Sequence, residues 1–409
     1  MHVCAISFKE CWRDGAGRWL SSGGFPVQMS AIASLFDGMT LLVVEGAPRG
    51  GGLPLPRDVR VVPLRAPRGH DLRRKLSVVA GLPHYLRTIA RHARRADVVH
   101  VPLPGDLPLL GLAVAVLLRR RVLARYGGSW TVTSQTTLMN RVTRTALRLC
   151  AGGRTVVLVT GAAAPDAPRP GRAMHWLFAT AISRAEVERV RPDLSRPLRR
   201  PPRLAYVGRL SPEKGVAVLV EAMARLREMG PVDERPRLVL AGDGPERDRL
   251  AALVRERGCD DVITFAGQLD RTALVTLLSE TDLCVLPSLT ESFCKARLDA
   301  MICGVPVVTT EVGFGREIVG ADGERGWIVP SGRADALAAT LRRALAEPRD
   351  WPALRQRCRR YTEALTIEAW TDAIAAICAG QWGLAREEGR LVPRRSAPAA
   401  ERAPAVRAT

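Results

Sequence analysis

Short apolar runs alternate along the chain with longer stretches in which apolar residues recur at helical spacing. The runs are too short for helices, are rich in Val and Leu and lie between turn residues, a pattern typical of strands buried on both faces. They fall at residues 3–7, 40–44, 59–62, 97–101, 122–126, 155–160, 204–207, 237–241, 262–266, 283–286 and 305–309. Strands that alternate with helices in this way predict an α/β fold with parallel sheets covered by helices.

The chain of 409 residues is long enough for two domains of ordinary size. Residues 192–202 are rich in Pro and Arg and are the best candidate for a linker between them. We therefore expect an N-terminal domain over residues 1–200 and a second domain over 201–360. A further helix is expected over 361–384, and residues 385–409, rich in Arg, Ala, Pro and Glu, predict a disordered tail.

One stretch of the second domain places an acid just before a helix and another acid inside it. The apolar run at 283–286 is broken by Pro and Ser, and the helical composition of residues 293–303 ends at a Gly. Glu291 therefore lies in a loop at the carboxyl end of a strand, where open α/β sheets bind ligands. Asp299 follows eight residues later, about 12 Å along a helix.

The helix start between these acids predicts an anion site. Backbone amides near Phe293 and Cys294 lack helical partners and favour a negative group. Ser292 lies in the same turn, and Lys295 in the first helical turn either reaches a phosphate or faces solvent. One acid for a sugar, amides for a diphosphate and a second acid for a ribose fit this single turn and helix.

A second cationic turn follows the strand at residues 204–207. Gly208 opens it, and Arg209 and Lys214 lie within it before a helix starts. Two cations here can neutralise a departing diphosphate without a metal. Lys is rare in this chain, with only four among 61 basic residues, so Lys214 and Lys295 together favour a role for compact ammonium groups.

Two further glycine turns are candidates for phosphate contact. Gly244 follows the strand at residues 237–241, at the edge of the sheet where ligands bind. Gly23 and Gly24 precede a helix that begins near Pro26, and a glycine pair lets backbone approach a phosphate closely. A plain tight turn is the alternative explanation for this pair.

Together these segments resemble the donor site of retaining glycosyltransferases of family 4, also called group 1. Those enzymes have two Rossmann-like domains that face each other across a cleft, the GT-B fold. Their acidic motif is Glu, seven residues, then Glu, followed by Ala-Met and Gly-x-Pro-Val-Val. Here Glu291 and Asp299 take the acidic positions, and residues 300–301 and 304–308 follow in register.

The resemblance implies a role for each matching residue. Arg209 and Lys214 would grip the donor diphosphate, Glu291 would contact the sugar, and Asp299 would hold the ribose. It also implies that the nucleotide base lies near the loops after the strands at 237–241 and 262–266, and that the last helix packs back on the first domain. The resemblance is specific over residues 203–346 and only architectural over the first 200, so it bears on the donor more than on the acceptor.

Two departures from the family pattern stand out. Asp299 replaces the second Glu and shortens its reach by one methylene. Many members also carry a His after the strand that corresponds to residues 122–126, where this chain has Gly127 and Gly128. The loop over 127–130 remains a candidate for contact with the acceptor or the sugar, whereas His100, on the preceding strand, has the placing of a structural residue.

Charge is concentrated in the first half of the chain. The net charge is +20, and residues 1–200 hold 31 Lys and Arg against 12 Asp and Glu, while residues 201–409 hold 30 against 29. Such a field attracts anionic membrane surfaces, lipid-diphosphate acceptors, acidic glycans or nucleic acid. The basic helical segment at 72–95 is either membrane- or acceptor-facing or a solvated face. No aromatic platform or helix-turn-helix pattern supports nucleic acid.

Cysteine usage and the termini bear on location. The nine cysteines show no Cys-x-x-Cys pair, which predicts no metal site and reduced thiols in a cytosolic protein. The N-terminus opens directly on a strand and does not resemble a signal peptide. The longest apolar run, at residues 107–118, is too short to span a bilayer. We expect a cytoplasmic protein that is peripheral on the inner face of the membrane.

These observations predict a metal-independent, retaining glycosyltransferase that needs no cofactor. Its donor would be a nucleotide diphosphate sugar, and its acceptor a cell-envelope, polysaccharide or lipid-linked molecule. The alternatives are an epimerase or phosphorylase on the same scaffold, or a nucleotide-sugar-binding protein with impaired catalysis. A phosphorylase would need a cofactor lysine, and this chain, with four lysines, has almost none to spare. An NAD dehydrogenase is disfavoured because no Gly-x-Gly-x-x-Gly follows the first strand of either domain.

Overall fold

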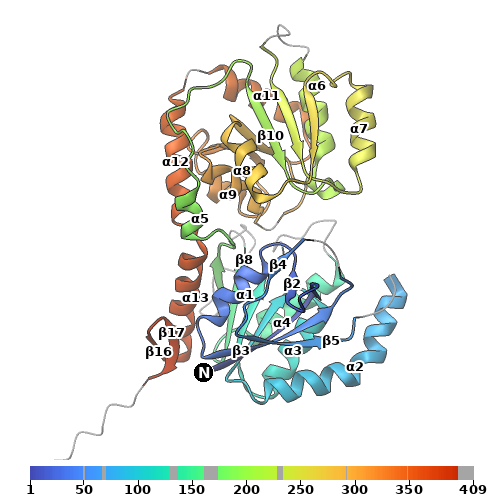
Figure 1. The fold of residues 1–409 in the computed structure, drawn as a ribbon, viewed down its shortest axis with the longest axis vertical. Helices are drawn as coiled ribbons and strands as arrows, with labels where there is room; N and C mark the ends of the chain where they lie inside the picture. The colour runs from blue at the N-terminus through green and yellow to red at the C-terminus, as the bar shows by residue number, and fades with distance from the viewer. Residues whose placement is uncertain are drawn as a thin grey trace, which may run out of the picture.

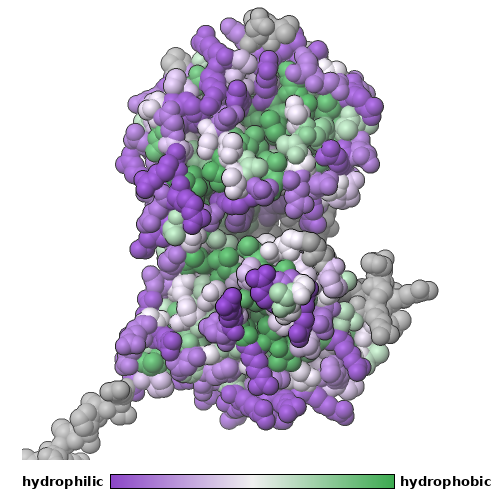
Figure 2. Space-filling view, viewed as in Figure 1, coloured by the Kyte–Doolittle hydropathy of each residue, from purple (hydrophilic) through white to green (hydrophobic). Residues whose placement is uncertain are grey.

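The chain folds into two α/β domains stacked along the long axis of the molecule (Figure 1). The computed structural model describes residues 1–48, 51–66, 71–128, 137–160, 174–227, 234–291, 293–347 and 349–394, with backbone only for 71–76. In the space-filling view the molecule narrows where the two domains meet (Figure 2). The predicted α/β class with parallel sheets is confirmed.

The N-terminal domain is built on a sheet that has nine strands within the described residues. They are β1 (His2–Arg13), β2 (Trp19–Ser21), β3 (Gly38–Glu45), β4 (Leu53–Pro54), β5 (Val59–Leu64), β6 (Val98–Leu103), β7 (Arg121–Tyr126), β8 (Thr155–Thr160) and β9 (Met174–Leu177). Strand β1 pairs in parallel with β3 and β6, and its far end turns back through β2 as an antiparallel extension. It is therefore much longer than the run at residues 3–7 predicted.

Helices cover both faces of this sheet, which explains its continuous apolar runs. They are α1 (Phe25–Ala33), α2 (Asp71–Ala93), α3 (Asp106–Leu117) and α4 (Leu138–Cys150). On β1, Val3 and Ala5 face a core shared with α1, while Cys4 and Ile6 face a core shared with α2, α3 and α4. Because successive strand residues point to opposite faces, both sets must be apolar.

The C-terminal domain has a six-stranded parallel sheet in the order β12-β11-β10-β13-β14-β15, counted over the described residues. Its strands are β10 (Arg203–Val207), β11 (Arg237–Ala241), β12 (Ile263–Gly267), β13 (Leu283–Leu286), β14 (Val307–Thr310) and β15 (Gly326–Val329). Its helices are α5 (Arg184–Arg189), the 3₁₀ turn η1 (Pro212–Lys214), α6 (Val216–Arg227), α7 (Arg247–Glu256), α8 (Arg271–Ser279), α9 (Lys295–Ile302), α10 (Gly315–Val319), α11 (Ala334–Ala346) and α12 (Trp351–Glu363).

Local sequence sets where several of these helices begin. Asp270 accepts a hydrogen bond from the Ala273 amide at 2.8 Å at the start of α8, and Asp350 accepts one from the Ala353 amide at 2.9 Å at the start of α12. Such caps satisfy amides that have no helical partner.

The chain crosses between the domains twice, and the two crossings are hydrogen-bonded to each other. The amide of Ile367 donates to the carbonyl of Ile182 at 2.8 Å, and the amide of Arg184 donates to the Glu368 carboxylate at 2.9 Å. Val187 of α5 already packs in the C-terminal core. The first crossing therefore precedes the boundary that we expected at residue 200, because α5 buries its apolar face against the second domain.

After the second crossing, α13 (Ile367–Trp382) packs on the N-terminal domain, where Trp370 and Ile374 join the core beside α1. The chain then forms a hairpin from β16 (Leu384–Glu387) and β17 (Arg390–Pro393). The expectation of disorder from residue 385 is wrong for this hairpin, because buried Leu384 and Leu391 anchor it to the same core. The tail beyond it, residues 395–409, lies outside the described residues.

None of the described helices combines the length and the apolar character that crossing a membrane requires.

Candidate active site

Three loops meet in backbone contact at the carboxyl edge of the C-terminal sheet. A Cβ atom on Gly242 would lie 1.8 Å from the Gly208 carbonyl oxygen, one on Gly244 would lie 2.3 Å from that of Leu210, and one on Gly215 would lie 2.2 Å from that of Pro287. No other residue type fits these positions without moving backbone. The glycines therefore bring together the loops that follow β10, β11 and β13.

The loop after β10 is hydrogen-bonded to the other two. The amide of Leu210 donates to the carbonyl of Asp243 at 3.0 Å, and the amide of Leu289 donates to the carbonyl of Glu213 at 2.9 Å. The cationic turn and the loop that bears the first acid are thus held in a fixed relation before any ligand binds.

Lys214 and Glu291 form an ion pair across this junction. Their side chains are 22% and 14% exposed, so the pair is partly shielded from water. Each charge neutralises the other in the absence of an anionic ligand. The structure thus joins two of the predicted catalytic residues directly.

Arg209 lies five residues before Lys214, and its side chain is mostly exposed. Its side chain is 68% exposed, with its nearest acidic oxygen, on Glu213, 3.5 Å away. A hydrogen bond from the Ser211 hydroxyl at 2.6 Å lowers the pKa of Glu213 and keeps that carboxylate charged. Arg209 also lines a cavity of about 340 Å³ together with Gly208, Asp243 and Gln268.

The helix α9 begins directly after the Glu291 loop. Cys294 precedes its first residue and has φ +58° and ψ +83°, a left-handed conformation that disfavours side chains. Burial raises the pKa of its thiol, so the group is a protonated, packed side chain. Phe293 is buried against the ring of Phe314, with ring centroids 5.4 Å apart. Ser292 lies outside the described residues.

Asp299 is buried in the middle of α9 and is bound to two cations. The guanidinium of Arg271 donates to its Oδ1 at 2.7 Å, and the Lys295 ammonium donates to the same oxygen at 3.1 Å. We expected Lys295 either to reach a phosphate or to face solvent. Its ammonium instead pairs with Asp299, and its side chain stays 45% exposed. The carboxylate of Asp299 has no contact with the Lys214–Glu291 pair among the described interactions.

Arg271 links the Asp299 carboxylate to α5, the helix that follows the first crossing between the domains. Its Nε lies 2.5 Å from the Glu186 carboxylate of α5, while its Nη1 holds Asp299. Burial works against the charge on Arg271, but the two acids outweigh it and raise its pKa. Arg271 and Glu186 could not be predicted as partners of Asp299, because nothing in their local sequence places them beside a residue of α9.

Arg297 is a second residue that sequence patterns missed. Its side chain is fully buried and donates to the carbonyls of Phe293 at 3.2 Å and Val312 at 3.2 Å, and to the hydroxyl of Thr309 at 3.1 Å. It therefore fastens the start of α9 to the loop after β14. Its position beside Lys295 and Asp299 in the same short helix gave no local signal that its side chain is buried.

The glycine pair of the N-terminal domain lies at the crossing between the domains. A Cβ atom on Gly24 would lie 2.6 Å from that of Ala181, and Gly23 has φ +69°. Four residues after Gly24, the Gln28 side chain donates to the carbonyl of Thr180 at 2.9 Å. Close packing against Ala181 therefore explains the glycine at position 24 without a bound phosphate.

The strands that flank the missing family His provide no replacement for it. His100 is fully buried, its Nδ1 lies 2.9 Å from the Leu123 carbonyl, and burial lowers its pKa to about 3. It is a neutral structural residue. The amide of Gly127 donates to the Leu103 carbonyl at 2.7 Å, and residues 129–130 of the candidate loop lie outside the described residues. In the part of the chain that is described, no three His, Cys, Asp or Glu residues gather as metal ligands would.

Solved structures of the same architecture define the class of fold. Sucrose-phosphate synthase from Thermosynechococcus elongatus matches 94% of this chain and 99% of its own, with a TM-score of 0.70 at 22% identity. Anabaena Alr3699/HepE in complex with UDP-glucose matches 93% of this chain and 100% of its own, with a TM-score of 0.67 at 16% identity. The fold is the GT-B fold of two facing Rossmann-like domains.

Sequence comparison then gives the family. Residues 193–365 match the family described as "Glycosyl transferases group 1". The 2-deoxystreptamine glucosyltransferase of Streptomyces kanamyceticus is 31% identical over 283 residues, which are 62% of this chain and 69% of that relative. The chain belongs to the group 1 glycosyltransferases.

A glycogen synthase of Mycobacterium tuberculosis is 34% identical over 209 residues, 51% of this chain and 48% of the relative. The chain thus spans about half the length of that curated relative.

Proposed function

We propose that this protein is a retaining glycosyltransferase that moves a sugar from a nucleotide diphosphate sugar to an acceptor bound between its two domains. The observation that carries the proposal is the junction at which Lys214 meets Glu291, with Arg209 on the same loop. It lies at the carboxyl edge of a parallel sheet, the ligand edge of such folds. Membership of the group 1 family supports the same activity.

In this proposal the donor diphosphate competes with Glu291 for Lys214. Once the ion pair opens, Lys214 and Arg209 neutralise the negative charge that develops on the leaving diphosphate. The amides at the start of α9 add partial positive charge. Glu291, released from Lys214, orients the sugar or supports positive charge at its anomeric carbon.

The nucleotide would extend away from this junction along the sheet edge. Asp299 is our candidate for the ribose hydroxyls, through the Oδ2 atom that lies 3.3 Å from the Lys295 ammonium. The cavity of about 340 Å³ beside Gly208, Asp243 and Gln268 is our candidate for the base. Relatives of this fold have been solved with UDP and with UDP-glucose, which supports a nucleotide sugar as the donor class.

The acceptor would lie against the N-terminal domain, and closure of the domains would exclude water, which competes with transfer. We propose a cell-envelope, polysaccharide or lipid-linked acceptor because the first half of the chain carries 31 basic residues against 12 acidic ones. A cytoplasmic protein held at the inner face of the membrane would meet such acceptors.

The test is a panel of nucleotide sugars, scored first for protection against thermal unfolding and then for transfer. We expect one donor to protect the protein, and we expect Lys214→Ala and Glu291→Ala to abolish transfer with the fold intact. Arg257→Ala, which breaks the surface pair with Glu221, is the control and should leave transfer unchanged. Wild-type turnover in either site variant would overturn the proposal.

A chelator separates the metal-free mechanism from a metal-dependent one. Because two cationic side chains neutralise the diphosphate, transfer should persist when divalent metal is removed. Complete loss of transfer, reversed by added metal, would contradict this part of the proposal.

A nucleotide-sugar-binding protein with impaired catalysis is the second candidate. Gly127 and Gly128 in place of the family His favour it. Donor protection with no turnover on any acceptor would support this candidate, whereas conversion of the donor sugar to its epimer would point to an epimerase.

A further inference from the structure

One face of α4 exposes leucine, valine and arginine side chains together. Its outward residues recur at helical spacing and are Leu138, Arg141, Val142, Thr145, Arg148 and Leu149. Leu138 and Leu149 are 76% and 83% exposed, and Val142 is 46% exposed. The opposite side of the helix is anchored in the domain, where Thr143, Arg144 and Leu147 are buried. The exposed apolar side chains are therefore not needed to hold α4 in place.

The end of α3 extends this surface. Val116 and Leu117 are 42% and 82% exposed, and α3 packs beside α4. Both helices end at the amino edge of the sheet, where the guanidinium of Arg154 donates to the carbonyl of Arg119 at 2.6 Å. We call the six outward residues of α4 together with Val116 and Leu117 the α4 face. With thirteen residues, α4 alone makes it about 20 Å long.

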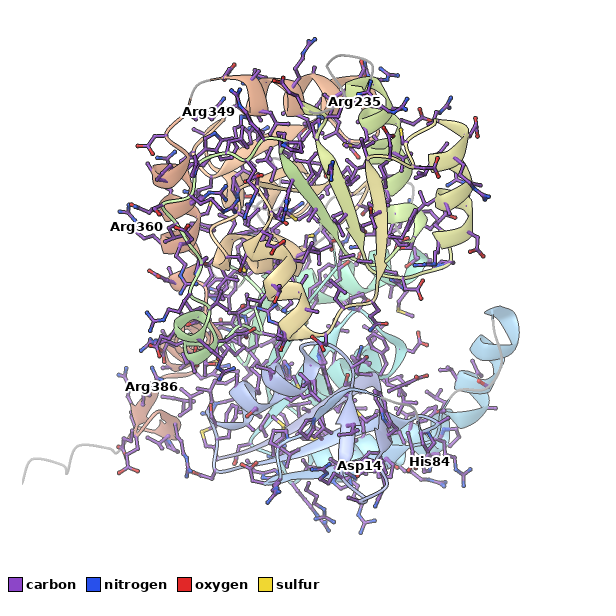
Figure 3. All side chains as sticks on the ribbon, turned by 45° about the horizontal axis from the view of Figure 1, so that its top comes forward. Asp14, His84, Arg235, Arg349, Arg360 and Arg386 are labelled. Carbon is purple, nitrogen blue, oxygen red and sulfur yellow. The ribbon has the colours of Figure 1, made fainter. Side chains whose placement is uncertain are left out.

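The charge around the α4 face is mainly positive. Residues 71–160 hold 15 Lys and Arg against three Asp, and α4 contains no acid at all. The C-terminal half of the chain differs, because residues 201–409 hold 30 Lys and Arg against 29 Asp and Glu. There Arg235 lies 3.6 Å from Asp261, and Arg349 pairs with Glu347 (Figure 3 labels both arginines). The positive field of the N-terminal domain is therefore largely uncompensated.

This combination selects among partners. Two copies of the α4 face would bring like charges together, which opposes self-association. A nucleic acid would satisfy the arginines but would leave three aliphatic side chains of α4 in water. An anionic bilayer accepts both kinds of group, because leucines enter the boundary between headgroups and acyl chains while arginines meet lipid phosphates.

We propose that the α4 face docks the protein on an anionic lipid bilayer. It replaces the basic helical segment at residues 72–95 as the membrane-facing element. Among the side chains that the structure describes in that segment, the exposed large hydrophobic ones are Val79 and Leu86, at 65% and 37%, and Pro83 interrupts the helix between them. The apolar helix α3 instead buries Leu107 and Leu112 against the sheet and contributes only its end.

Docking through α4 would also orient the cleft. Strands β7 and β8 run in parallel, so the helix between them runs back and begins at the carboxyl edge of the N-terminal sheet. The end of the α4 face at Leu138 is therefore the end nearer the donor domain. A lipid-linked acceptor would enter from the surface on which the protein rests, a consequence that depends on the proposed transferase function, although docking itself does not.

The test is co-sedimentation of the full chain with vesicles of phosphatidylcholine alone and of phosphatidylcholine with one quarter phosphatidylglycerol. We expect binding to the anionic vesicles only, and weaker binding as salt screens the arginines. The triple variant Leu138→Ser, Val142→Ser, Leu149→Ser should reduce the partition coefficient at least about tenfold, since three aliphatic contacts are lost. Val79→Ser, on α2 of the same domain, is the matched control and should bind as wild type.

Two results would overturn the proposal. One is a triple variant that binds anionic vesicles as well as wild type does, and the other is a wild-type dimer in gel filtration that the triple variant converts to a monomer. Protection by the nucleotide sugar, measured on the same triple variant, should be unchanged. That readout shows that the variant is folded and separates failure of docking from failure of the donor site.

Discussion

In the ion pair between Lys214 and Glu291, each side chain neutralises the charge of the other. Both side chains are mostly shielded, so an unpaired charge in either would be costly. In the proposed exchange, Glu291 yields Lys214 only to a stronger anion. A diphosphate carries more charge than a carboxylate and receives Arg209 and the α9 amides as well, which favours the exchange.

Glu291→Gln tests this exchange because it removes the competing charge and keeps the shape. We expect the nucleoside diphosphate that protects best in the donor panel to bind about fivefold more tightly, about 1 kcal/mol, while transfer is lost. Titration calorimetry measures the change, and the corresponding nucleoside without phosphates is the control, since its affinity should not move. Weaker diphosphate binding in the variant would contradict the exchange.

Cys294 stores strain at the start of α9. Its φ of +58° lies in the left-handed region, which costs an ordinary residue about 1–2 kcal/mol and costs glycine little. Its side chain is partly buried and packs against the core of the C-terminal domain, and this packing offsets part of the cost.

Cys294→Gly should therefore raise the free energy of unfolding, by about 1 kcal/mol after the loss of the packed thiol. Cys294→Ala is the matched control, because it removes the sulfur and keeps the strained backbone. We expect it to destabilise the protein. Urea titration measures both variants, and a less stable glycine variant would show that packing of the thiol outweighs the backbone strain.

At the scale of elements, the sequence predicted the strands and the turns that carry the site. Apolar runs bounded by Gly and Pro located β10 and β13, and the Lys214 and Glu291 loops followed from them. The pairing of Asp299 with Arg271 could not be predicted, because it joins α9 to α8 and through Glu186 to α5. Such contacts depend on the relative placement of helices, which local patterns do not encode.

The same limit applies to the glycines and to the domain boundary. Gly215 directly follows Lys214 in the sequence, but its contact with the Pro287 carbonyl depends on two loops that are far apart in the chain. The Pro- and Arg-rich segment at 192–202 looks like a linker, yet α5 before it already belongs to the second domain. Composition identified a segment without regular structure there and could not say which side of the crossing it lay on.

Gly215→Ala tests whether backbone contact between loops builds the donor site. Gly332→Ala is its matched control, since both residues have positive φ, +65° and +74°, but the Gly332 site has its nearest atom 3.9 Å away. Each variant should lose about 1 kcal/mol from the backbone conformation. Only Gly215→Ala should lose more stability than that and also lose thermal protection by the donor. Equal losses in the two variants would mean that the loop contact is not needed.

At the scale of the whole molecule, a buried carboxylate fixes the segment between α5 and β10. Asp282 is fully buried at the start of β13 and is bound by Arg196 at 2.5 Å, by Arg355 of α12 at 2.9 Å and by the Arg203 amide at 2.9 Å. Asp282 thus connects the segment at residues 192–202, the sheet and α12. Removing one member of this group would leave a buried charge unpaired, which is strongly destabilising. The group therefore holds the three segments rigidly together.

The two helices that end the chain belong to different cores, although only three residues separate them. Trp351 of α12 lies in the C-terminal core and Trp370 of α13 in the N-terminal core, and each has an arginine guanidinium 5.6 Å from its ring centroid. The N-terminal domain is thus completed by the last part of the chain. Its stability should depend on α13 as much as on residues near the N-terminus.

Trp370→Ala and Trp351→Ala form a matched pair that tests this division. Each removes a large buried side chain and should cost about 3–5 kcal/mol. In scanning calorimetry, Trp370→Ala should lower the unfolding transition of the N-terminal domain and Trp351→Ala that of the C-terminal domain. A nucleotide sugar bound to the C-terminal domain raises that transition and so identifies it. If both variants lowered the same transition, the two domains would unfold as one unit, and the interdomain crossings at Ile182 and Ile367 would be strong enough to couple them.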